Sequence, residues 1–249
     1  MKAMSLSSCK EIDEILEQAL LKNVELYKRC SVPRLTPLKA FVQNNRAKVI
    51  GNLLEVQTGF IAKRLILYHA ACYNIIDIVT LFVNSISFDV KEFGEFVDVP
   101  LTIAIENRSV DMVQLLIENG ARASERFCLD RYSYMHLAVQ ANCIKIVKLL
   151  IKSGFDMNAR TMISNQTPLH QAISIEYFDT ARILIIHGAE LDQKSLSMTV
   201  IKEHHELLKL LIEFGASLIA RTQFGINSFE LTLSRNKIGI SKSLLYLTV

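Results

Sequence analysis

The sequence predicts an all-α protein, an α-solenoid of stacked helix-turn-helix repeats with projecting hairpin loops. Half of the 249 residues are apolar, yet the chain contains only 9 glycines and 4 prolines, which favours many helices with wide buried faces. Apolar residues recur at helical spacing, and similar segments return at a fixed interval. The composition excludes a disordered chain, because disorder requires low hydrophobicity and a high net charge. It also excludes collagen-like and low-complexity chains.

The end of each repeat is the clearest signal. A run rich in leucine and isoleucine leads into a glycine in four segments: Leu115–Ala121, Leu149–Phe155, Leu184–Ala189 and Leu210–Ala216. The glycines Gly120, Gly154, Gly188 and Gly215 follow one another at intervals of 34, 34 and 27. A glycine directly after a helix is typical of a position that needs a positive φ. Each run therefore predicts the second helix of a repeat.

A second motif lies at a constant distance before each of the first three glycines. It reads Val99–Ala104, Ser133–Ala138 and Thr167–Ala172, so its starts recur at the same interval as those glycines. Serine or threonine suits a helix N-cap, and a following proline such as Pro168 suits the first helical position. This motif predicts the first helix of each repeat. Looser copies open near residues 36, 66, 194 and 227.

These motifs resemble the ankyrin repeat, whose unit of about 33 residues opens with T-P-L-H-x-A. The segment Thr167–Ala172 matches that opening at every fixed position. The resemblance covers about seven repeats in residues 33–249, and residues 1–32 are interpreted as an N-terminal capping helix because they carry an amphipathic pattern. It implies a non-enzymatic module that binds a protein partner through a concave face and finger loops.

The apolar pattern supports stacking independently of the resemblance. The stripe that begins at Val110 returns one repeat later at Ile144, and again at Phe178. A two-helix unit has two apolar faces and cannot bury both alone, whereas stacked units bury each face against a neighbour. Terminal repeats need a polar outer face, which fits the serines Ser241 and Ser243 in the last copy.

Histidines and cysteines are the residues that could suggest metal or catalytic chemistry. We align His69, His136 and His170 at one repeat position and predict that they hold loops by hydrogen bonds, as the ankyrin pattern implies. Other copies carry Thr102 or Ser197 there, and hydroxyls are poor substitutes for a catalytic imidazole. The five cysteines are odd in number and lack C-x-x-C spacing, so neither a disulfide framework nor a metal site is predicted. No cofactor is expected.

Several other functions find no support in the sequence. Phosphate-loop, dinucleotide-binding, serine-hydrolase and zinc-protease motifs are absent, so no catalytic residue is predicted. The most apolar stretch, residues 65–83, contains His69, Asn74 and Asp77, which argues against a membrane span. The net charge of +3 is spread along the chain and does not indicate a nucleic-acid partner. No signal peptide is seen, and we expect an intracellular, cytoplasmic or nuclear monomer.

The candidate partner-binding residues lie in the loops between repeats. Gly188 and Lys194 are only 6 positions apart, where the preceding copies span 13, so one finger is expected to be shortened. Arginine and aromatic residues dominate binding energy at many interfaces. On that basis we select the following residues, in three fingers: Arg122, Arg126, Phe127, Arg131 and Tyr132; Asp156, Asn158, Arg160 and Met162, which is followed by Ile163; and Arg221 and Phe224.

Two further hypotheses stay open at this stage. The chain could be a pathogen or parasite effector that mimics host ankyrin-type inhibitors of transcription factors, since it consists of repeats with degenerate ends. It could also be an adapter for a ubiquitin ligase, which would need a docking segment after the last repeat. The sequence names neither the partner nor the pathway.

Overall fold

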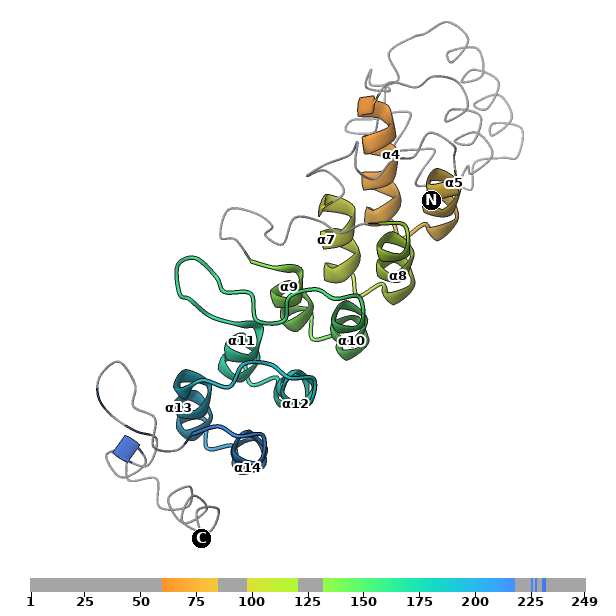
Figure 1. Ribbon diagram of the computed structural model, residues 1–249. Coiled ribbons are helices and arrows are strands. Elements are labelled where there is room, and N and C mark those ends of the chain that lie inside the picture. Colours follow the sequence, from red (N-terminus) through yellow and green to blue (C-terminus); the bar gives the residue numbers. More distant parts are fainter. Residues whose placement is uncertain are drawn as a thin grey trace, which may run out of the picture. The chain divides into compact units, whose positions relative to one another are not determined.

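The computed structural model describes residues 60–84, 98–120 and 132–217, together with residues 225, 227, 230 and 231. The expected capping helix in residues 1–32 and the copy near residue 36 lie outside these residues. The chain divides into two compact units, residues 1–123 and 124–249, and each is described by itself. The regular elements of the described part are ten α-helices (Figure 1). None of them is both long enough and apolar enough to cross a bilayer.

The first unit contains two helix pairs. Helices α4 (Phe60–Cys72) and α5 (Ile76–Asn84) form one pair, and α7 (Asp98–Glu106) and α8 (Val110–Glu118) form the next. Helix α4 packs against both α5 and α7, and α8 packs against α7 and α5. Side chains from all four helices fill the core, each at most 2 % exposed: Ile66, Leu67, Ala70, Ala71, Ile78, Val79, Phe82, Leu101, Ala104, Ile105, Met112, Val113 and Leu116.

The second unit contains three helix pairs in two layers. The first helices are α9 (Tyr134–Gln140), α11 (Pro168–Ser174) and α13 (Gln193–Ile201). The second helices are α10 (Ile144–Lys152), α12 (Phe178–Ile186) and α14 (His205–Glu213). The first helices contact one another in succession, and so do the second helices (Figure 1). The predicted solenoid of helix-turn-helix repeats is confirmed in this arrangement.

The core repeats with the period seen in the sequence. In α10 the buried positions are Ile146, Val147 and Leu150, and the equivalent positions of α12 one repeat later, Thr180, Ala181 and Leu184, are buried as well. In α14, after the shorter interval, they are Leu207, Leu208 and Leu211. All of these side chains are at most 2 % exposed. Burying a leucine, isoleucine or valine contributes about 1.5–3 kcal/mol, so each interface between repeats holds several such contributions.

The second helices end at the predicted glycines. Gly120, Gly154, Gly188 and Gly215 have φ values of 88°, 79°, 91° and 94°. After α10, the amide of Gly154 donates to the Ile151 carbonyl at 3.0 Å, and the amide of Phe155 donates to the Leu150 carbonyl at 3.1 Å. This pair of bonds is the Schellman motif, which satisfies the last carbonyls of a helix.

The first helices end in the same way but without glycine. The residue with positive φ is Asn74, Arg108, Asn142, Glu176 or Glu203, with φ between 50° and 63°. These residues recur with the same period as the glycines, including the shorter last interval. The turns explain how the chain forms two helix ends per repeat with so few glycines. Three of them are also joined to the following repeat: Ser109 bonds to Asn74, Thr180 to Asn142, and Lys202 to Glu176.

The register of these turns corrects one sequence alignment. Counted back one repeat at a time, the positions equivalent to His136 are Thr102 and then Tyr68, so His69 lies just beyond the motif position. The structure places His69 in the last turn of α4, with its ring near Tyr68 and Tyr73. His136, by contrast, lies in the first turn of α9. The residue types around His69 resemble the motif, but the position of the turn at Asn74 shows that Tyr68 occupies the equivalent position.

The expected starts of the copies lie at different places in their helices. Residues 66 and 99 fall inside α4 and α7, and Lys194 falls in the first turn of α13, whose N-cap is Asp192. Asn227 shows the geometry of a helix start. Its amide donates to the Glu230 carboxylate at 3.0 Å, and its side-chain oxygen accepts from the Glu230 amide at 2.8 Å.

Replacing Arg108 with glycine is expected to raise the free energy of unfolding by about 1 kcal/mol. A side chain at positive φ is strained, and glycine removes that strain at the expense of a more flexible unfolded chain. Urea denaturation of the full chain measures the change. The matched control is Gly154→Ala, whose added Cβ would meet nothing within 4 Å, so that only backbone strain changes. This control should lower the stability, and a shift of the same sign in both variants would contradict the explanation.

Candidate functional site

The first turns of α9 and α11 are built around buried histidines. Ser133 caps α9 by accepting from the His136 amide at 3.4 Å, and Thr167 caps α11 by accepting from the His170 amide at 3.3 Å. Each imidazole also accepts a hydrogen bond from the main chain of the capping residue. Nδ1 of His136 accepts from the Ser133 amide at 3.2 Å, and Nδ1 of His170 accepts from the Thr167 amide at 3.0 Å. Both side chains are fully buried.

The other nitrogen of each ring bonds to the following repeat. Nε2 of His136 lies 3.0 Å from the Gln166 carbonyl oxygen, and Nε2 of His170 lies 2.7 Å from Oδ1 of Asp192. A carbonyl or carboxylate oxygen only accepts, so Nε2 carries the proton in both rings. The predicted structural role of these two histidines therefore has a geometric basis. Both ring nitrogens are engaged, which leaves neither imidazole available as a general base.

The pKa shifts of His136 and Asp192 are consistent with these hydrogen bonds. Burial lowers the pKa of His136, and this outweighs the opposing effect of its bond to Gln166. Burial raises the pKa of Asp192, but the hydrogen bonds from the His170 side chain and the Ser195 amide lower it by more than burial raises it, so that the pKa falls to about 2. The Asp192 carboxylate therefore stabilises the fold above its unfolded pKa near 4, and this stabilisation is lost as the pH falls toward 2.

The connection from α12 to α13 is much shorter than its predecessor. Gly188 and the N-cap Asp192 are 4 positions apart, whereas Gly154 and Thr167 are 13 apart. The shortening is therefore larger than counting to Lys194 suggests. Figure 1 shows the contrast between the long loop that joins α10 to α11 and the direct passage from α12 to α13.

The base of the long finger, residues 155–166, is fixed to this short connection. Oδ1 of Asp156 accepts from the Asn158 amide at 2.8 Å, and Oδ1 of Asn158 accepts from the Glu190 amide at 2.9 Å. Arg160 forms an ion pair with Glu190 at 3.1 Å and lies 4.0 Å from Asp192. Three of the predicted binding residues thus take part in contacts within this base.

The tip of the same finger is ordered by its own hydrogen bonds. The Thr161 amide donates to the Gln166 carbonyl at 2.9 Å, and the Gln166 amide donates to Oγ1 of Thr161 at 3.0 Å. Between them, Met162 is 54 % exposed and Ile163 is 84 % exposed. These are the two most exposed large apolar side chains in the described part of the chain, and exposed apolar groups mark interaction surfaces when they cluster. Met162 is among the binding residues predicted from the sequence, and its neighbour Ile163 is not.

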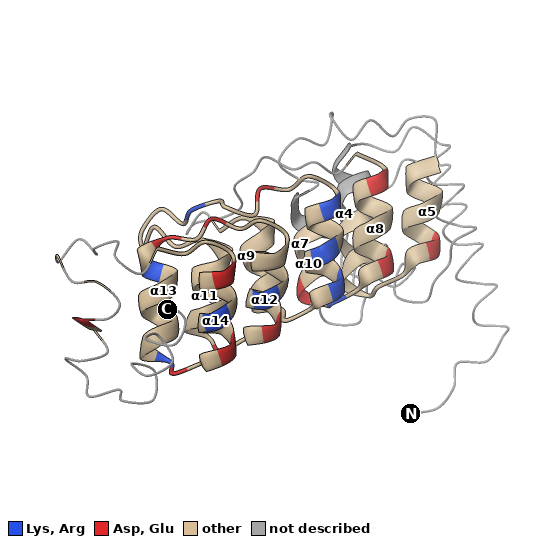
Figure 2. Cartoon of the chain, turned by 60° about the horizontal axis from the view of Figure 1, so that its bottom comes forward, with Lys and Arg blue, Asp and Glu red and all other residues tan. Residues whose placement is uncertain are grey.

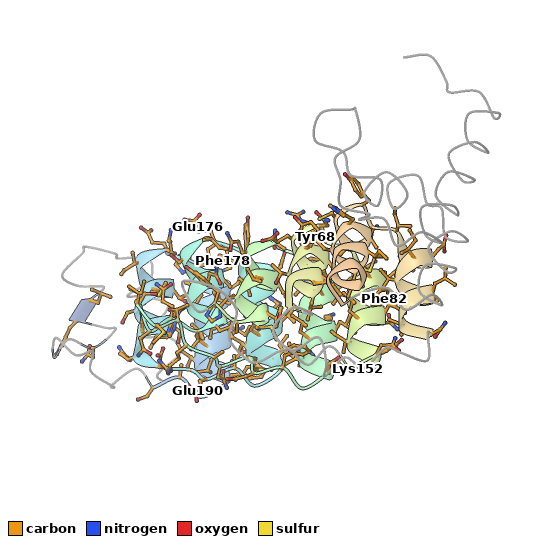
Figure 3. The ribbon with its side chains drawn as sticks, turned by 90° about the horizontal axis from the view of Figure 1, so that it is seen from above. Tyr68, Phe82, Lys152, Glu176, Phe178 and Glu190 are labelled. Carbon is orange, nitrogen blue, oxygen red and sulfur yellow. The ribbon has the colours of Figure 1, made fainter. Side chains whose placement is uncertain are left out.

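The layer of first helices offers a second accessible surface. Gln140, Ser174 and Ile201 are the last residues of α9, α11 and α13, and all three are exposed. Figure 3 places Glu190 at one edge of the second unit and Glu176 at the opposite edge, where the helix-helix turns lie. The fingers and the helix-helix turns therefore lie on opposite edges.

The second helices present mainly charged side chains to solvent. Lys145, Lys148 and Lys152 are exposed along α10, where Figure 2 shows the basic residues in blue. At the equivalent positions α14 carries Glu206, Lys209 and Glu213, so the charge pattern is not repeated. A charged, solvated face is the ordinary outer side of a helix.

Only part of the predicted finger set can be located. Tyr132 is half-buried and its ring lies edge-on to His136, with centroids 5.6 Å apart, so it contributes to packing. The remaining members lie outside the described residues: Arg122, Arg126, Phe127, Arg131, Arg221 and Phe224. The structure adds Lys194, whose ammonium donates to the Ser164 carbonyl at 3.1 Å. A cation just after a shortened connection is the signal that could have indicated it.

The described ranges contain no group of three or more histidine, cysteine, aspartate or glutamate side chains that could hold a metal ion. Cys72 and Cys143 are free thiols that are partly buried. What the arrangement offers chemically is a fixed surface of apolar, amide and charged groups. Such a surface suits the recognition of another molecule.

Comparison with known proteins supports this interpretation. Residues 94–161 and 128–195 match the family model described as ankyrin repeats (3 copies). Among solved structures, 398 chains match. One is the ankyrin repeat domain of Bcl-3, described as a unique member of the IkappaB protein family. It shares 18 % identity, covers 85 % of this chain and 98 % of its own length, and gives a TM-score of 0.68. At that identity the likeness concerns the fold. No curated protein sequence matches the chain.

A double-mutant cycle is expected to reveal the hydrogen bond between His170 in α11 and Asp192, the N-cap of α13. His170→Ala and Asp192→Ala should show a coupling of about 1 kcal/mol or more in the free energy of unfolding, because they remove the two ends of this hydrogen bond. The loss of the α13 cap belongs to the Asp192→Ala change alone and cancels in the cycle. The matched control is His187→Ala with Asp192→Ala. His187 bonds only within its own helix, to the Ile183 carbonyl, so additive effects are expected there. Equal coupling in both cycles would contradict the assignment.

The stability of the chain is expected to fall as the pH drops from 7 to 5, partly because of His136. Its folded pKa lies below the ordinary value near 6.5, so the unfolded chain binds the proton more readily. The contribution is present above a pH of about 6.5 and is lost as the pH falls through the lower folded pKa. His136→Gln should flatten this dependence, since glutamine at the third helical position can still complete the cap. Urea midpoints across this range measure it, and an unchanged slope would contradict it.

Proposed function

Because the chain is an ankyrin-repeat protein, we propose that it is a non-enzymatic module that binds a protein partner through its finger loops and the face of its first helices. Stacked repeats form extended surfaces that are used for recognition. The observation that carries the proposal is the ordered finger of residues 155–166, which holds Met162 and Ile163 in solvent. A protein gains little from such exposure unless another molecule covers it.

The titratable groups at the helix caps support binding rather than catalysis. The two buried histidines are engaged at both nitrogens, and Asp192 accepts from His170 and from the Ser195 amide. A general base needs a nitrogen or oxygen that can reach a substrate proton. The described residues therefore favour recognition without turnover.

The likeness to Bcl-3 does not favour one class of partner over another. It is a likeness of fold at 18 % identity, and function resides in the particular surface residues. The effector hypothesis and the ubiquitin-ligase adapter hypothesis both stay predictions. Both hypotheses involve an intracellular, monomeric binding module, and this shared part is what we propose.

Affinity purification with the tagged full chain, after mild crosslinking, tests the proposal. A partner bound at the first-helix face is expected to be recovered at least about tenfold less with Ser174→Arg, which places a large charge at the exposed end of α11, the helix between α9 and α13. The matched control is Lys209→Glu on α14, which is 56 % exposed and on the charged outer layer. Its recovery should equal that of the unaltered chain. Failure to recover any specific protein, or equal loss with both variants, would count against the proposal.

A further inference from the structure

The short connection between α12 and α13 leaves the tip of the finger of residues 155–166 without a neighbouring finger on that side. Gly154 and Thr167, the N-cap of α11, are 13 positions apart, but Gly188 and Asp192, the N-cap of α13, are only 4 positions apart. The missing residues would have formed the next finger. The first turn of α13 lies directly beside the tip, since Lys194 bonds to the carbonyl of Ser164 at 3.1 Å. The strong exposure of Met162 and Ile163 is therefore found where the chain supplies no further finger.

We propose that a segment of a protein partner takes the place of this missing finger, with an apolar side chain against Met162 and Ile163 and a carboxylate against Lys194. This inference rests on the proposed function and specifies the partner chemistry at one of its surfaces. The segment is short, because it covers the tip of a single finger and the first turn of one helix.

The finger tip is prepared for binding by its internal bonds. The Thr161 and Gln166 main chains are paired, the Thr161 and Ser164 hydroxyls lie 2.8 Å apart, and the Asn165 amide donates to the Thr161 carbonyl at 3.1 Å. Asn165 has φ of 48°, a conformation that asparagine tolerates. A surface that is already ordered loses little conformational entropy when a partner binds.

The charge beside the tip selects an acidic partner. Arg160 is already paired with Glu190. Within the described ranges no carboxylate forms an ion pair with Lys194, whose ammonium bonds to a main-chain carbonyl and has two further protons to donate. A carboxylate next to an apolar residue therefore matches the two features that this surface offers.

Other occupants fit less well. An anionic membrane attracts clusters of basic residues, whereas this finger and the short connection also carry the carboxylates of Asp156, Glu190 and Asp192. A second copy of the chain would have to offer the same acidic and apolar combination in an accessible segment. Both occupants become outcomes of the test.

A phage-displayed library of random dodecapeptides is the probe. The library is selected on the full chain and counter-selected on the empty support, and the enriched peptides are then tested on Ile163→Ser, which should fold normally because that side chain is 84 % exposed. Enriched peptides are expected to combine apolar residues with aspartate or glutamate. Their Kd, measured by fluorescence anisotropy, should rise about tenfold or more with Ile163→Ser and about threefold to tenfold with Lys194→Glu. Lys209→Glu, a charge reversal on the exposed side of α14, should leave it unchanged. Circular dichroism and Tm confirm the fold of each variant.

The inference is overturned if peptides selected on the full chain bind Ile163→Ser equally well or lack acidic residues. In the first case the proposed binding function stands, while the assignment of the binding site to this finger tip is wrong. If no peptide is enriched, this inference falls, and the purification experiment decides the broader function separately. Sedimentation with phosphatidylserine vesicles that depends on Ile163 would assign the tip to a membrane. Dimerisation seen by analytical ultracentrifugation and abolished by Ile163→Ser would assign it to a second copy.

Discussion

Each helix pair in this chain has two apolar faces, and the need to bury both of them against neighbouring pairs governs the rest of the structure. Helix α11 shows the constraint, since it packs against α9 on one side and α13 on the other, with Leu169, Ala172 and Ile173 fully buried. Because apolar contacts are made with nearest neighbours, stability is distributed along the stack rather than concentrated in one core. Polar groups that lie away from the charged outer faces of the second helices are consequently found mainly at the turns, the helix starts and the fingers.

Those polar groups are then used mainly to join one repeat to the next. His136 and His170 each complete a helix cap and bond across to the following repeat, and Asn142 accepts from Thr180 of the next pair. Asp156, Asn158 and Arg160 connect the finger base to the short connection. An unpaired buried polar group would be costly, so most of these side chains are committed to the fold. Ile163, the most exposed large apolar side chain of the described residues, gains significance for that reason.

The sequence was sufficient to predict the second helices and their glycines, because a fixed period and a positive-φ requirement both leave a mark in residue type. The starts of the first helices were harder to predict. His69 matches the motif by letter, yet the turn at Asn74 places it one position beyond the motif, and Asp192 caps α13 before the expected Lys194. Asn158 and Arg160 have the composition of a binding loop, and only the contact with Glu190 shows that they take part in packing. Residue type alone cannot separate these roles.

The finger that would precede α13 can be absent from the fold at little cost, because a side chain replaces a main-chain group. His136 bonds to the carbonyl of Gln166, the last residue of a full finger. His170 has no such carbonyl and bonds instead to the carboxylate of Asp192, which also caps α13. The bond between repeats is thus kept while the finger is absent. What the substitution does not replace is the cover that a finger would give to Met162 and Ile163, so the consequence of the deletion falls on the surface and not on the core.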